Sequence, residues 1–292
     1  MDGERVLDRL IDLALLEDVG PGDWTTLWTV SPEAMGEAAI IAKDTLIVAG
    51  TEAASRAFHR ADPGLTVTVV APVGSSAGAG ESLIEVEGSL RGILTGERIA
   101  LNFLGRLSGI ASQTRRFVEV VAGTTAKILD TRKTTPGWRI LEKEAVRAGG
   151  GENHRQGLHD MVLVKDNHLR AAGGVRAAVE RVLRENEIGI PVEVEVSTME
   201  ELNELLSISH LGVNRVLLDN MSLKEMAEAV TRVRRGGKES EGGGPGLLVE
   251  ASGNITLENV RAVAETGVDL ISVGALTHSA PAADVSLRIL KR

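Results

Sequence analysis

Six short apolar runs in the second half of the chain place the tightest limits on its fold. They end near residues 129, 164, 196, 218, 250 and 273, so successive ends lie 22 to 35 residues apart. Each run is rich in Val, Ile and Leu and stops abruptly at polar residues, as buried strands do. The segments between them, such as RAAVERVLREN and LKEMAEAVTRVRR, have helical periodicity. Repeating units of this length predict an incomplete (β/α) barrel, with a doubly wound parallel sheet as the alternative.

The first half of the chain has a different pattern. Residues 1–20 are amphipathic, with apolar side chains at helical spacing, and predict a packed helix. A turn-rich passage, EDVGPGDWTT, is followed by four β-rich runs between residues 37 and 87: AAIIAK, TLIVAG, LTVTVVAPVG and LIEVEG. The stretch GERIALNFLGRLSGIASQTRRFVEVV then predicts a long helix that is apolar on more than one face.

Composition excludes several classes of protein. The formal net charge of −9 argues against a nucleic-acid or anionic-membrane surface, and the 2% aromatic content gives few stacking platforms for bases. No apolar run approaches the roughly 18–20 residues that span a bilayer. The chain has no cysteine, which fits a reducing compartment, so we predict a cytoplasmic protein. The Gly-rich stretch Arg234–Gly246 is predicted to be a mobile surface loop.

The polar residues that follow the apolar runs should carry the chemistry, because the carboxyl ends of parallel strands meet at one edge of a barrel. A glycine-rich bend between the first two runs adds a histidine and an arginine. Four cations there can neutralise carboxylates or phosphates, the last two glycine-containing turns can cradle a phosphate, and two acids can hold ribose hydroxyls or magnesium. The residues concerned are Thr131, Arg132, Lys133, His154, Arg155, Lys165, Glu195, Asp219, Ser252, Gly253, Asn254, Gly274 and Ala275.

Each of these features also has a simpler explanation. The basic pair could be a solvated turn, Lys165 a surface lysine, and the Ser-Gly-Asn and Gly-Ala motifs ordinary turns. The acids of VEVEVS could face solvent on an edge strand. His154, His159 and His168 fit no standard metal spacing. Because the simple explanations would have to hold independently at six strand ends, we favour a single anion-binding site.

Beyond this pattern, the run TRKTTPGWRILEKEAVRAGGGENHRQGLHDMVLVKDNHL closely resembles the signature of the quinolinate phosphoribosyltransferases, also called nicotinate-nucleotide pyrophosphorylases (carboxylating). The motifs EDVGPGDWTT, GERIALNFLGRLSGIAS, VEVEV, VLLDNMS, EASGNITLENV and ISVGALTHSAP are similar to the same family. The resemblance implies an N-terminal α/β sandwich domain over residues 1–105, joined by 277–292, and an incomplete barrel over 106–276. It also implies a homodimer with shared active sites.

The family's reaction joins quinolinate to phosphoribosyl pyrophosphate and releases carbon dioxide and pyrophosphate, giving nicotinate mononucleotide for NAD biosynthesis. The resemblance implies that magnesium is carried on the diphosphate, at most through water to the two acids, and not by protein side chains directly. The resemblance implies that the carboxylates of quinolinate are bound by Arg132, Lys133, His154, Arg155 and Lys165, with Thr131 beside the substrate and Arg98 supplied by the neighbouring subunit. It implies that Glu195 and Asp219 contact the ribose, and that the 5-phosphate is surrounded by Ser252, Gly253, Asn254, Val273, Gly274, Ala275 and His278. The catalytic residues that it implies are Lys133, Glu195 and Asp219.

Some residues depart from the family pattern. Asn254 stands where many members have glycine, which leaves its role open, and Trp138 and Gln156 also differ. Three other functions remain possible at this stage. They are a related transferase acting on nicotinate, an aldolase that forms a Schiff base with Lys165, and a non-catalytic anion binder.

Overall fold

The computed structural model describes residues 3–238 and 246–291, which form two compact units. The first unit draws on residues 1–115, 134–150 and 276–292, and the second on residues 116–133 and 151–275. The domain boundary expected between residues 105 and 106 falls inside the long helix α4 (Leu90–Val120). Each unit is described by itself below.

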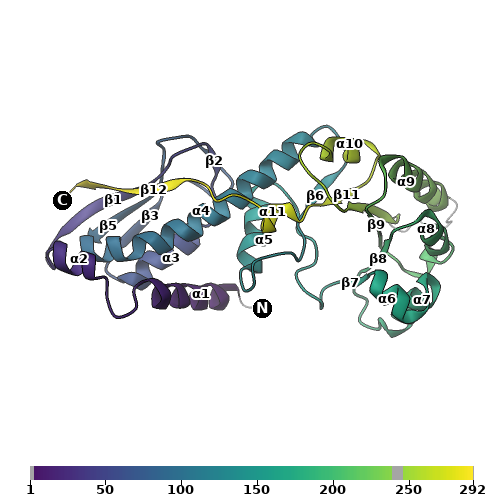
Figure 1. Cartoon of the computed structure of the whole chain (residues 1–292), viewed down its shortest axis with the longest axis horizontal. Helices are drawn as coiled ribbons and strands as arrows, with labels where there is room; N and C mark the ends of the chain where they lie inside the picture. The colour runs from purple at the N-terminus through teal and green to yellow at the C-terminus, as the bar shows by residue number, and fades with distance from the viewer. Residues whose placement is uncertain (1–2, 239–245, 292) are drawn as a thin grey trace. The chain divides into compact units, whose positions relative to one another are not determined.

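An antiparallel sheet organises the first unit (Figure 1). Its strand order is β12 (Val285–Lys291), β1 (Met35–Ala42), β5 (Ser82–Ser89) and β3 (Thr66–Val69). Strands β2 (Leu46–Ile47) and β4 (Ser76–Ala77) form a separate pair. Strand β12 pairs with β1 from Val285 opposite Ala42 to Lys291 opposite Glu37, so the end of the chain completes a sheet that its beginning started.

Helices pack against this sheet. Helix α1 (Gly3–Asp18) is the predicted N-terminal helix, and it buries Leu7 and Ile11 and packs on α3 (Thr51–Ala61). Helix α3 was not predicted, because it lies within a region read as β-rich. Helix α2 (Trp24–Thr29) was also not predicted; the side chain of Asp23 caps it by accepting a hydrogen bond from the Thr26 N–H at 3.0 Å.

A buried ion pair joins three segments of the first unit. Arg106 on α4 lies 2.8 Å from Glu142 on α5 (Arg139–Ala148), whose side chain has no exposed surface. The Thr135 N–H and hydroxyl donate to the same carboxylate at 3.1 and 2.8 Å. Arg106 also donates to the carbonyls of Thr277 and, at 3.0 Å, Ala280 in the C-terminal segment. One guanidinium therefore neutralises the acid and satisfies two backbone acceptors.

A six-stranded parallel sheet forms the second unit within the described residues, in the order β6-β11-β10-β9-β8-β7. Its strands are β6 (Lys127–Leu129), β7 (Val162–Val164), β8 (Val192–Val196), β9 (Arg215–Asp219), β10 (Leu248–Ser252) and β11 (Leu270–Ser272). All six predicted strands are therefore present. The sheet is open between β6 and β7, which confirms the incomplete barrel. Because β7 to β11 follow one another without reversal, the doubly wound alternative is wrong.

Helices link these strands. They are α6 (Asp166–Ala172), α7 (Val175–Glu185), α8 (Met199–Leu206), α9 (Leu223–Lys238) and α10 (Val260–Glu265), with a 3-10 turn at Ser209–Leu211. Helix α11 (Ala275–His278) follows β11 and leads into the C-terminal segment of the first unit. Helix α9 continues to Lys238, so the prediction of a surface loop is wrong for residues 234–238. Positions 239–245 of that predicted loop lie outside the described residues. Among the helices of the described ranges, none combines the length and apolar content that a bilayer crossing requires.

Candidate active site

The carboxyl end of β6 meets the glycine-rich segment that carries His154. The Glu152 N–H donates to the Ile128 carbonyl at 2.8 Å, so this segment runs alongside β6. Asp130 is fully buried and accepts the His154 N–H at 2.9 Å, which fixes the bend after the glycines. In the exposed turn that follows β6, the Thr131 hydroxyl accepts the Lys133 N–H at 3.0 Å. The acid that precedes the basic pair is therefore structural.

Two arginines lie close enough to repel one another. Arg155 is only 9% exposed, and burial, followed by the nearby charge of Arg132, lowers the pKa of its guanidinium. Glu193 and Asp160 act in the opposite direction. Arg155 donates to the Met161 carbonyl at 3.1 Å. A buried arginine beside a half-buried one attracts anions, because a bound anion would relieve the repulsion.

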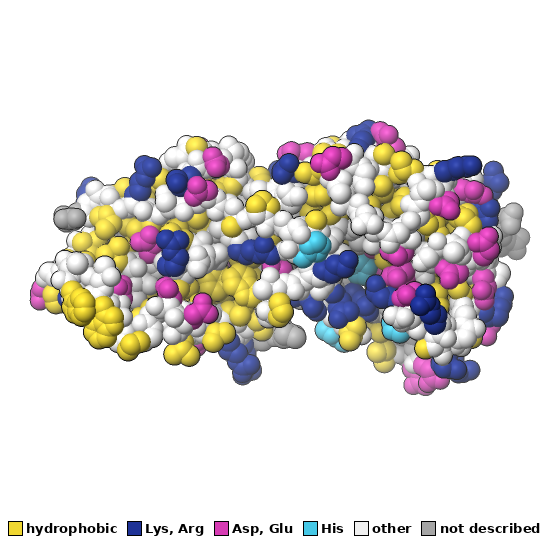
Figure 2. All heavy atoms as spheres, viewed as in Figure 1, with side chains coloured by type: hydrophobic (Ala, Val, Ile, Leu, Met, Phe, Trp, Pro, Cys, Tyr) yellow, Lys and Arg dark blue, Asp and Glu magenta, His cyan; other side chains and the backbone are white. Residues whose placement is uncertain are grey.

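A lysine and a glutamate join the ends of β7 and β8. Lys165 Nζ lies 2.9 Å from Glu195 Oε2, and Glu195 is 9% exposed. The Lys165 N–H donates to His168 Nδ1 at 2.9 Å, which shapes the start of α6. Figure 2 shows Lys and Arg side chains gathered on this part of the second unit, with Asp and Glu side chains beside them. The edge therefore offers both signs of charge.

The next strands end in turns. Asp219 at the end of β9 lies opposite Ser252 at the end of β10, and the Asn220 N–H donates to the Ser252 carbonyl at 3.0 Å. Gly253 has a φ of +101°, which a residue with a side chain rarely adopts. At the end of β11, Val273 is buried, and Gly274 and Ala275 are partly exposed where α11 begins.

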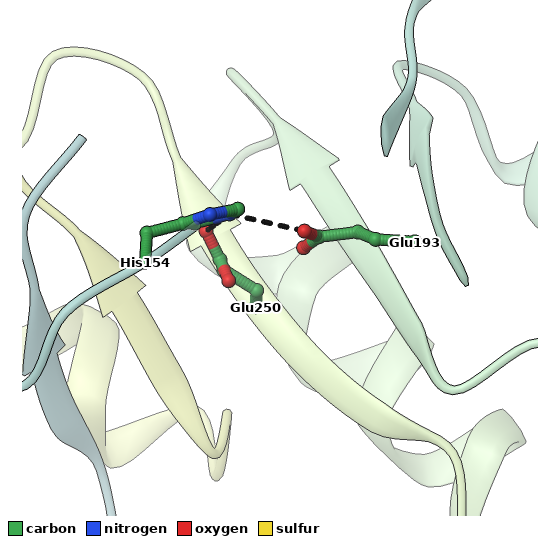
Figure 3. A group of neighbouring side chains, drawn as sticks. All are labelled: His154, Glu193 and Glu250. Carbon is green, nitrogen blue, oxygen red and sulfur yellow. Dashed lines mark ion pairs between the residues drawn. The ribbon is translucent and has the colours of Figure 1, made fainter. Parts of the chain in front are cut away.

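A buried charged cluster lies one layer below this edge. Figure 3 shows His154, Glu193 and Glu250 converging. His154 Nε2 lies 3.0 Å from Glu193 Oε2 and 3.5 Å from Glu250 Oε1, and both glutamates have no exposed surface. Arg215 pairs with Glu250 at 2.8 Å, and the hydroxyl of Ser272 donates to the same carboxylate. The cluster supports the segment that carries Arg155.

One imidazole and two carboxyl groups, those of His154, Glu193 and Glu250, have the composition of a metal site. The tautomer of His154 argues against metal binding there. The Arg155 N–H donates to His154 Nδ1 at 2.7 Å, so Nδ1 must present its lone pair and the ring proton lies on Nε2. That proton faces the two carboxyl groups, where a metal would require the lone pair. Burial raises the pKa of Glu193 and of Glu250 to about 7, and their mutual repulsion adds to the rise for Glu250. We therefore interpret the pair as sharing a proton.

The shared proton predicts a pH dependence of stability. A carboxyl whose pKa rises on folding stabilises the folded state at low pH and loses that effect as the pH passes through about 7. Between pH 4.5 and 7 the free energy of unfolding should fall, at most by about 1.4 kcal/mol per pH unit for one proton. The Glu193 side chain faces Glu250, His154, Arg155, Arg215 and Glu195. Glu193→Gln mimics its protonated form and should therefore flatten the dependence of unfolding free energy on pH. Denaturant unfolding at a series of pH values measures it, and an unchanged slope would contradict the shared proton.

Two predicted site residues belong to the first unit. Arg98 is exposed on α4, and His278 is exposed at the end of α11, where its Nδ1 lies 2.5 Å from Ser279 Oγ. The other predicted residues all lie in the second unit, at or next to the strand ends named above. The roles of Arg98 and His278 therefore stay predictions.

Sequence reasoning missed Glu193, Arg215, Glu250 and Ser272. Glu193 and Glu195 share one face of β8, and β8 lies between β7 and β9, so the solvent-facing edge strand considered for VEVEVS is wrong. The available signal was spacing. Glu193, Arg215 and Glu250 precede the residues at the strand ends by two or four positions, and alternate residues of a strand face the same side.

An open parallel α/β sheet whose strand ends carry paired arginines, a lysine–glutamate pair and glycine turns defines an enzyme of anionic substrates. Residues 23–108 match the N-terminal domain of quinolinate phosphoribosyl transferase, and residues 110–288 match its C-terminal domain. The chain therefore belongs to the quinolinate phosphoribosyltransferase family.

Individual relatives agree with this assignment. A probable nicotinate-nucleotide pyrophosphorylase [carboxylating] of Synechocystis is 40% identical over 286 residues, 98% of this chain and 93% of the relative. The chloroplastic nicotinate-nucleotide pyrophosphorylase [carboxylating] of Arabidopsis thaliana is 42% identical, over 97% of this chain and 82% of its own length. The solved nicotinate-nucleotide pyrophosphorylase of Francisella tularensis superposes with a TM-score of 0.89 at 36% identity, covering 98% of this chain and 96% of that one.

Proposed function

We propose that this protein transfers the phosphoribosyl group of phosphoribosyl pyrophosphate to quinolinate and releases pyrophosphate and carbon dioxide, giving nicotinate mononucleotide. Both domains match the family that carries this activity, and the curated relatives bear the names of this enzyme. Within this proposal, we assign a separate task to the side chains at each strand end.

The paired arginines are the observation that carries the proposal. The positive field that Arg132 imposes on Arg155 is the environment that a dicarboxylate neutralises. Arg155 is held from below by its bond to the Met161 carbonyl, so its orientation is set before a ligand arrives. Lys133 and Lys165 extend the positive surface, and His154 fixes the backbone of the same segment. A substrate with two adjacent carboxylates suits this set better than one with a single carboxylate.

The acids act on the sugar. As the pyridine nitrogen attacks C1 of the ribose and the bond to pyrophosphate breaks, positive charge builds on the sugar ring. Glu195 and Asp219 lie at the ends of β8 and β9 and can stabilise that charge. Lys165 Nζ, 2.9 Å from Glu195 Oε2, holds this carboxylate in its orientation. The backbone amides of residues 252–254 and 273–275 would bind the 5-phosphate.

Magnesium is part of the proposal. Carboxylates together with substrate phosphates form an oxygen set that Mg²⁺ accepts, usually with water between. Glu195 and Asp219 fit such a water-mediated contact, with the ion held on the diphosphate. The ion would neutralise negative charge that develops on the leaving pyrophosphate.

Decarboxylation follows from the first step. Once the ring nitrogen carries the ribose, the pyridinium accepts the electron pair of the neighbouring carbon–carboxylate bond. Carbon dioxide leaves, and a proton replaces it at that carbon. The arginines bind the carboxylates in the ground state, and exclusion of water favours the step because charge is lost as it proceeds.

Incubation of the purified protein with quinolinate, phosphoribosyl pyrophosphate and magnesium tests the function. We expect nicotinate mononucleotide and an equal amount of carbon dioxide. In a parallel incubation with nicotinate in place of quinolinate, consumption of nicotinate without carbon dioxide would instead support the related nicotinate-specific transferase. The Schiff-base alternative has no support from the geometry, because the amine of Lys165 is already engaged by the Glu195 carboxylate at 2.9 Å. Borohydride trapping with a carbonyl substrate should therefore leave Lys165 unmodified.

The proposal includes a homodimer in which Arg98 serves the partner's site, and this predicts complementation. Arg98→Ala and Lys133→Ala should each be inactive, whereas a mixed dimer contains one site with both residues intact. Random mixing should restore on the order of a quarter of the wild-type activity. Heterodimers isolated with two different affinity tags allow the measurement. An isolated heterodimer as inactive as its parents would contradict sharing. A cytoplasmic location stays a prediction, and the Arabidopsis relative is chloroplastic by name.

A further inference from the structure

Two asparagines with unusual backbone conformations face one another across the ends of β9 and β10. Asn220 has a φ of +53° and Asn254 a φ of +50°, and within residues 3–238 and 246–291 these are the non-glycine residues with positive φ. Residues with a side chain adopt such a conformation infrequently, although asparagine does so more readily than most, and it concentrates at functional sites. Asn220 directly follows Asp219, the acid assigned to the ribose.

The side chains of these residues are joined by hydrogen bonds. Asn220 Nδ2 donates to Asp219 Oδ2 at 3.0 Å, and Asn254 Nδ2 donates to Asn220 Oδ1 at 3.0 Å. Asn259 Nδ2 donates in turn to the Asn254 carbonyl at 2.9 Å, and the Thr256 N–H donates to Asn259 Oδ1 at 2.8 Å. A continuous chain of donors and acceptors thus runs from the loop before α10 to Asp219.

The direction of this chain is fixed by the charge at its end. An ionised carboxylate only accepts hydrogen bonds, so Asn220 must turn its NH₂ group toward Asp219. Its oxygen then faces Asn254, which must also present its NH₂ group. A side chain without a donor at position 254 would leave the Asn220 oxygen to mobile water, or would compete with Asp219 for the same NH₂ group.

Gly253 makes room for the bridge. A Cβ atom at this position would lie 2.2 Å from Asn220 Oδ1, well inside van der Waals contact. Gly253 therefore serves two purposes, since it adopts a positive φ and leaves space for the amide of Asn220. The glycine belongs to a side-chain arrangement as well as to a phosphate-binding turn.

We propose that Asn220 and Asn254 are positioning residues that form an amide bridge and fix the Asp219 carboxylate for the ribose of phosphoribosyl pyrophosphate. The inference rests on the proposed function, because it takes the ribose as the ligand of Asp219. The bridge engages Oδ2 of Asp219 and leaves Oδ1 to the substrate. The strained backbones at both asparagines are maintained because they bring the two amides together.

Substitutions at Asn254 separate the amide from the backbone. Asn254→Gly removes the amide and relieves the positive φ, so the denaturant midpoint should stay equal or rise. Asn254→Ala removes the amide but keeps the backbone strain. Both variants should weaken binding of phosphoribosyl pyrophosphate with magnesium by roughly 5- to 20-fold. This is the effect expected when Asn220, which donates to the Asp219 carboxylate, loses its own hydrogen bond from Asn254. Binding of quinolinate should not change in either variant. Asn254→Asp should weaken the binding of phosphoribosyl pyrophosphate further, because two carboxylates then compete for the NH₂ group of Asn220.

Titration calorimetry of the full-length variants with each substrate measures these affinities. Wild-type affinity for phosphoribosyl pyrophosphate in Asn254→Gly, with a loss only in Asn254→Ala, would overturn the bridge and assign the effect to backbone strain. Equal losses for both substrates would also overturn it, because they would indicate a general structural role. In a double-mutant cycle, adding Asn254→Gly to Asn220→Gly should have no further effect. A wild-type protein that binds neither substrate would contradict the proposed function instead, and the two failures are thus distinguished.

Discussion

Arg132→Ala is expected to lower kcat/KM for quinolinate by roughly 30- to 5000-fold, which corresponds to about 2–5 kcal/mol of transition-state stabilisation. The reason is that Arg132 is half-buried beside Arg155, where a charge-assisted contact to a carboxylate is little weakened by water. Steady-state kinetics with quinolinate as the varied substrate measures the loss. Removal of this charge should also let the pKa of Arg155 return toward its ordinary value.

Arg181→Ala is a matched control for this experiment. Arg181 is an exposed arginine on α7, so its removal changes the net charge by the same amount without touching the strand ends. Its kcat/KM should equal that of the wild type. If Arg132→Ala kept the efficiency of Arg181→Ala, the assignment of the quinolinate site would be wrong.

Arg106→Ala is expected to reduce the free energy of unfolding by about 3–5 kcal/mol, since it leaves a buried carboxylate without its ion-pair partner. Glu142 has no exposed surface, and the Thr135 donors that remain do not neutralise its charge. The carbonyls of Thr277 and Ala280 would lose the guanidinium as well. Denaturant unfolding gives the size of the effect, and hydrogen exchange should show that the C-terminal segment loses protection first.

Arg56→Ala provides the comparison. Arg56 also pairs with acids, Glu52 and Asp8, but these carboxylates are largely exposed, so the cost should be below about 1 kcal/mol. The double variant Arg106→Met with Glu142→Gln should regain part of the loss, because no uncompensated charge remains buried. Equal destabilisation by Arg56→Ala and Arg106→Ala would show that burial of Glu142 is not the cause.

The barrel strands could be predicted because their signal is local. Runs such as VEVEV and RVLL are short, β-branched and bounded by polar residues, and each formed a strand within one or two residues of its predicted position. Helix α3 was missed although its alanines and arginines favour a helix, because the segment was interpreted together with its β-rich neighbours. The end of helix α9 was predicted too early, because the glycines after Arg235 were expected to end the helix and did not do so before Lys238.

The site was predicted at its edge and not below it. Residues directly after a strand are recognisable because chain direction alone places them at the carboxyl edge. Whether Glu193 faces solvent or the interior depends instead on which strands flank β8, and strand order is a property of the whole fold. The contact between Asn254 and Asn220 likewise joins residues 34 positions apart through one backbone angle each, which no local pattern encodes.

Strand β12 has a consequence for the order in which the first unit can fold. Its pairing with β1 joins Lys291 to Glu37, residues 254 positions apart, and residues 151–275 of the second unit lie between them in the sequence. Closing so long a loop costs chain entropy before the pairing stabilises the sheet, so contacts of this kind tend to form late in folding. Until β12 is in place, β1 presents unpaired N–H and C=O groups to other chains, and β12 afterwards forms the edge of the sheet in its stead.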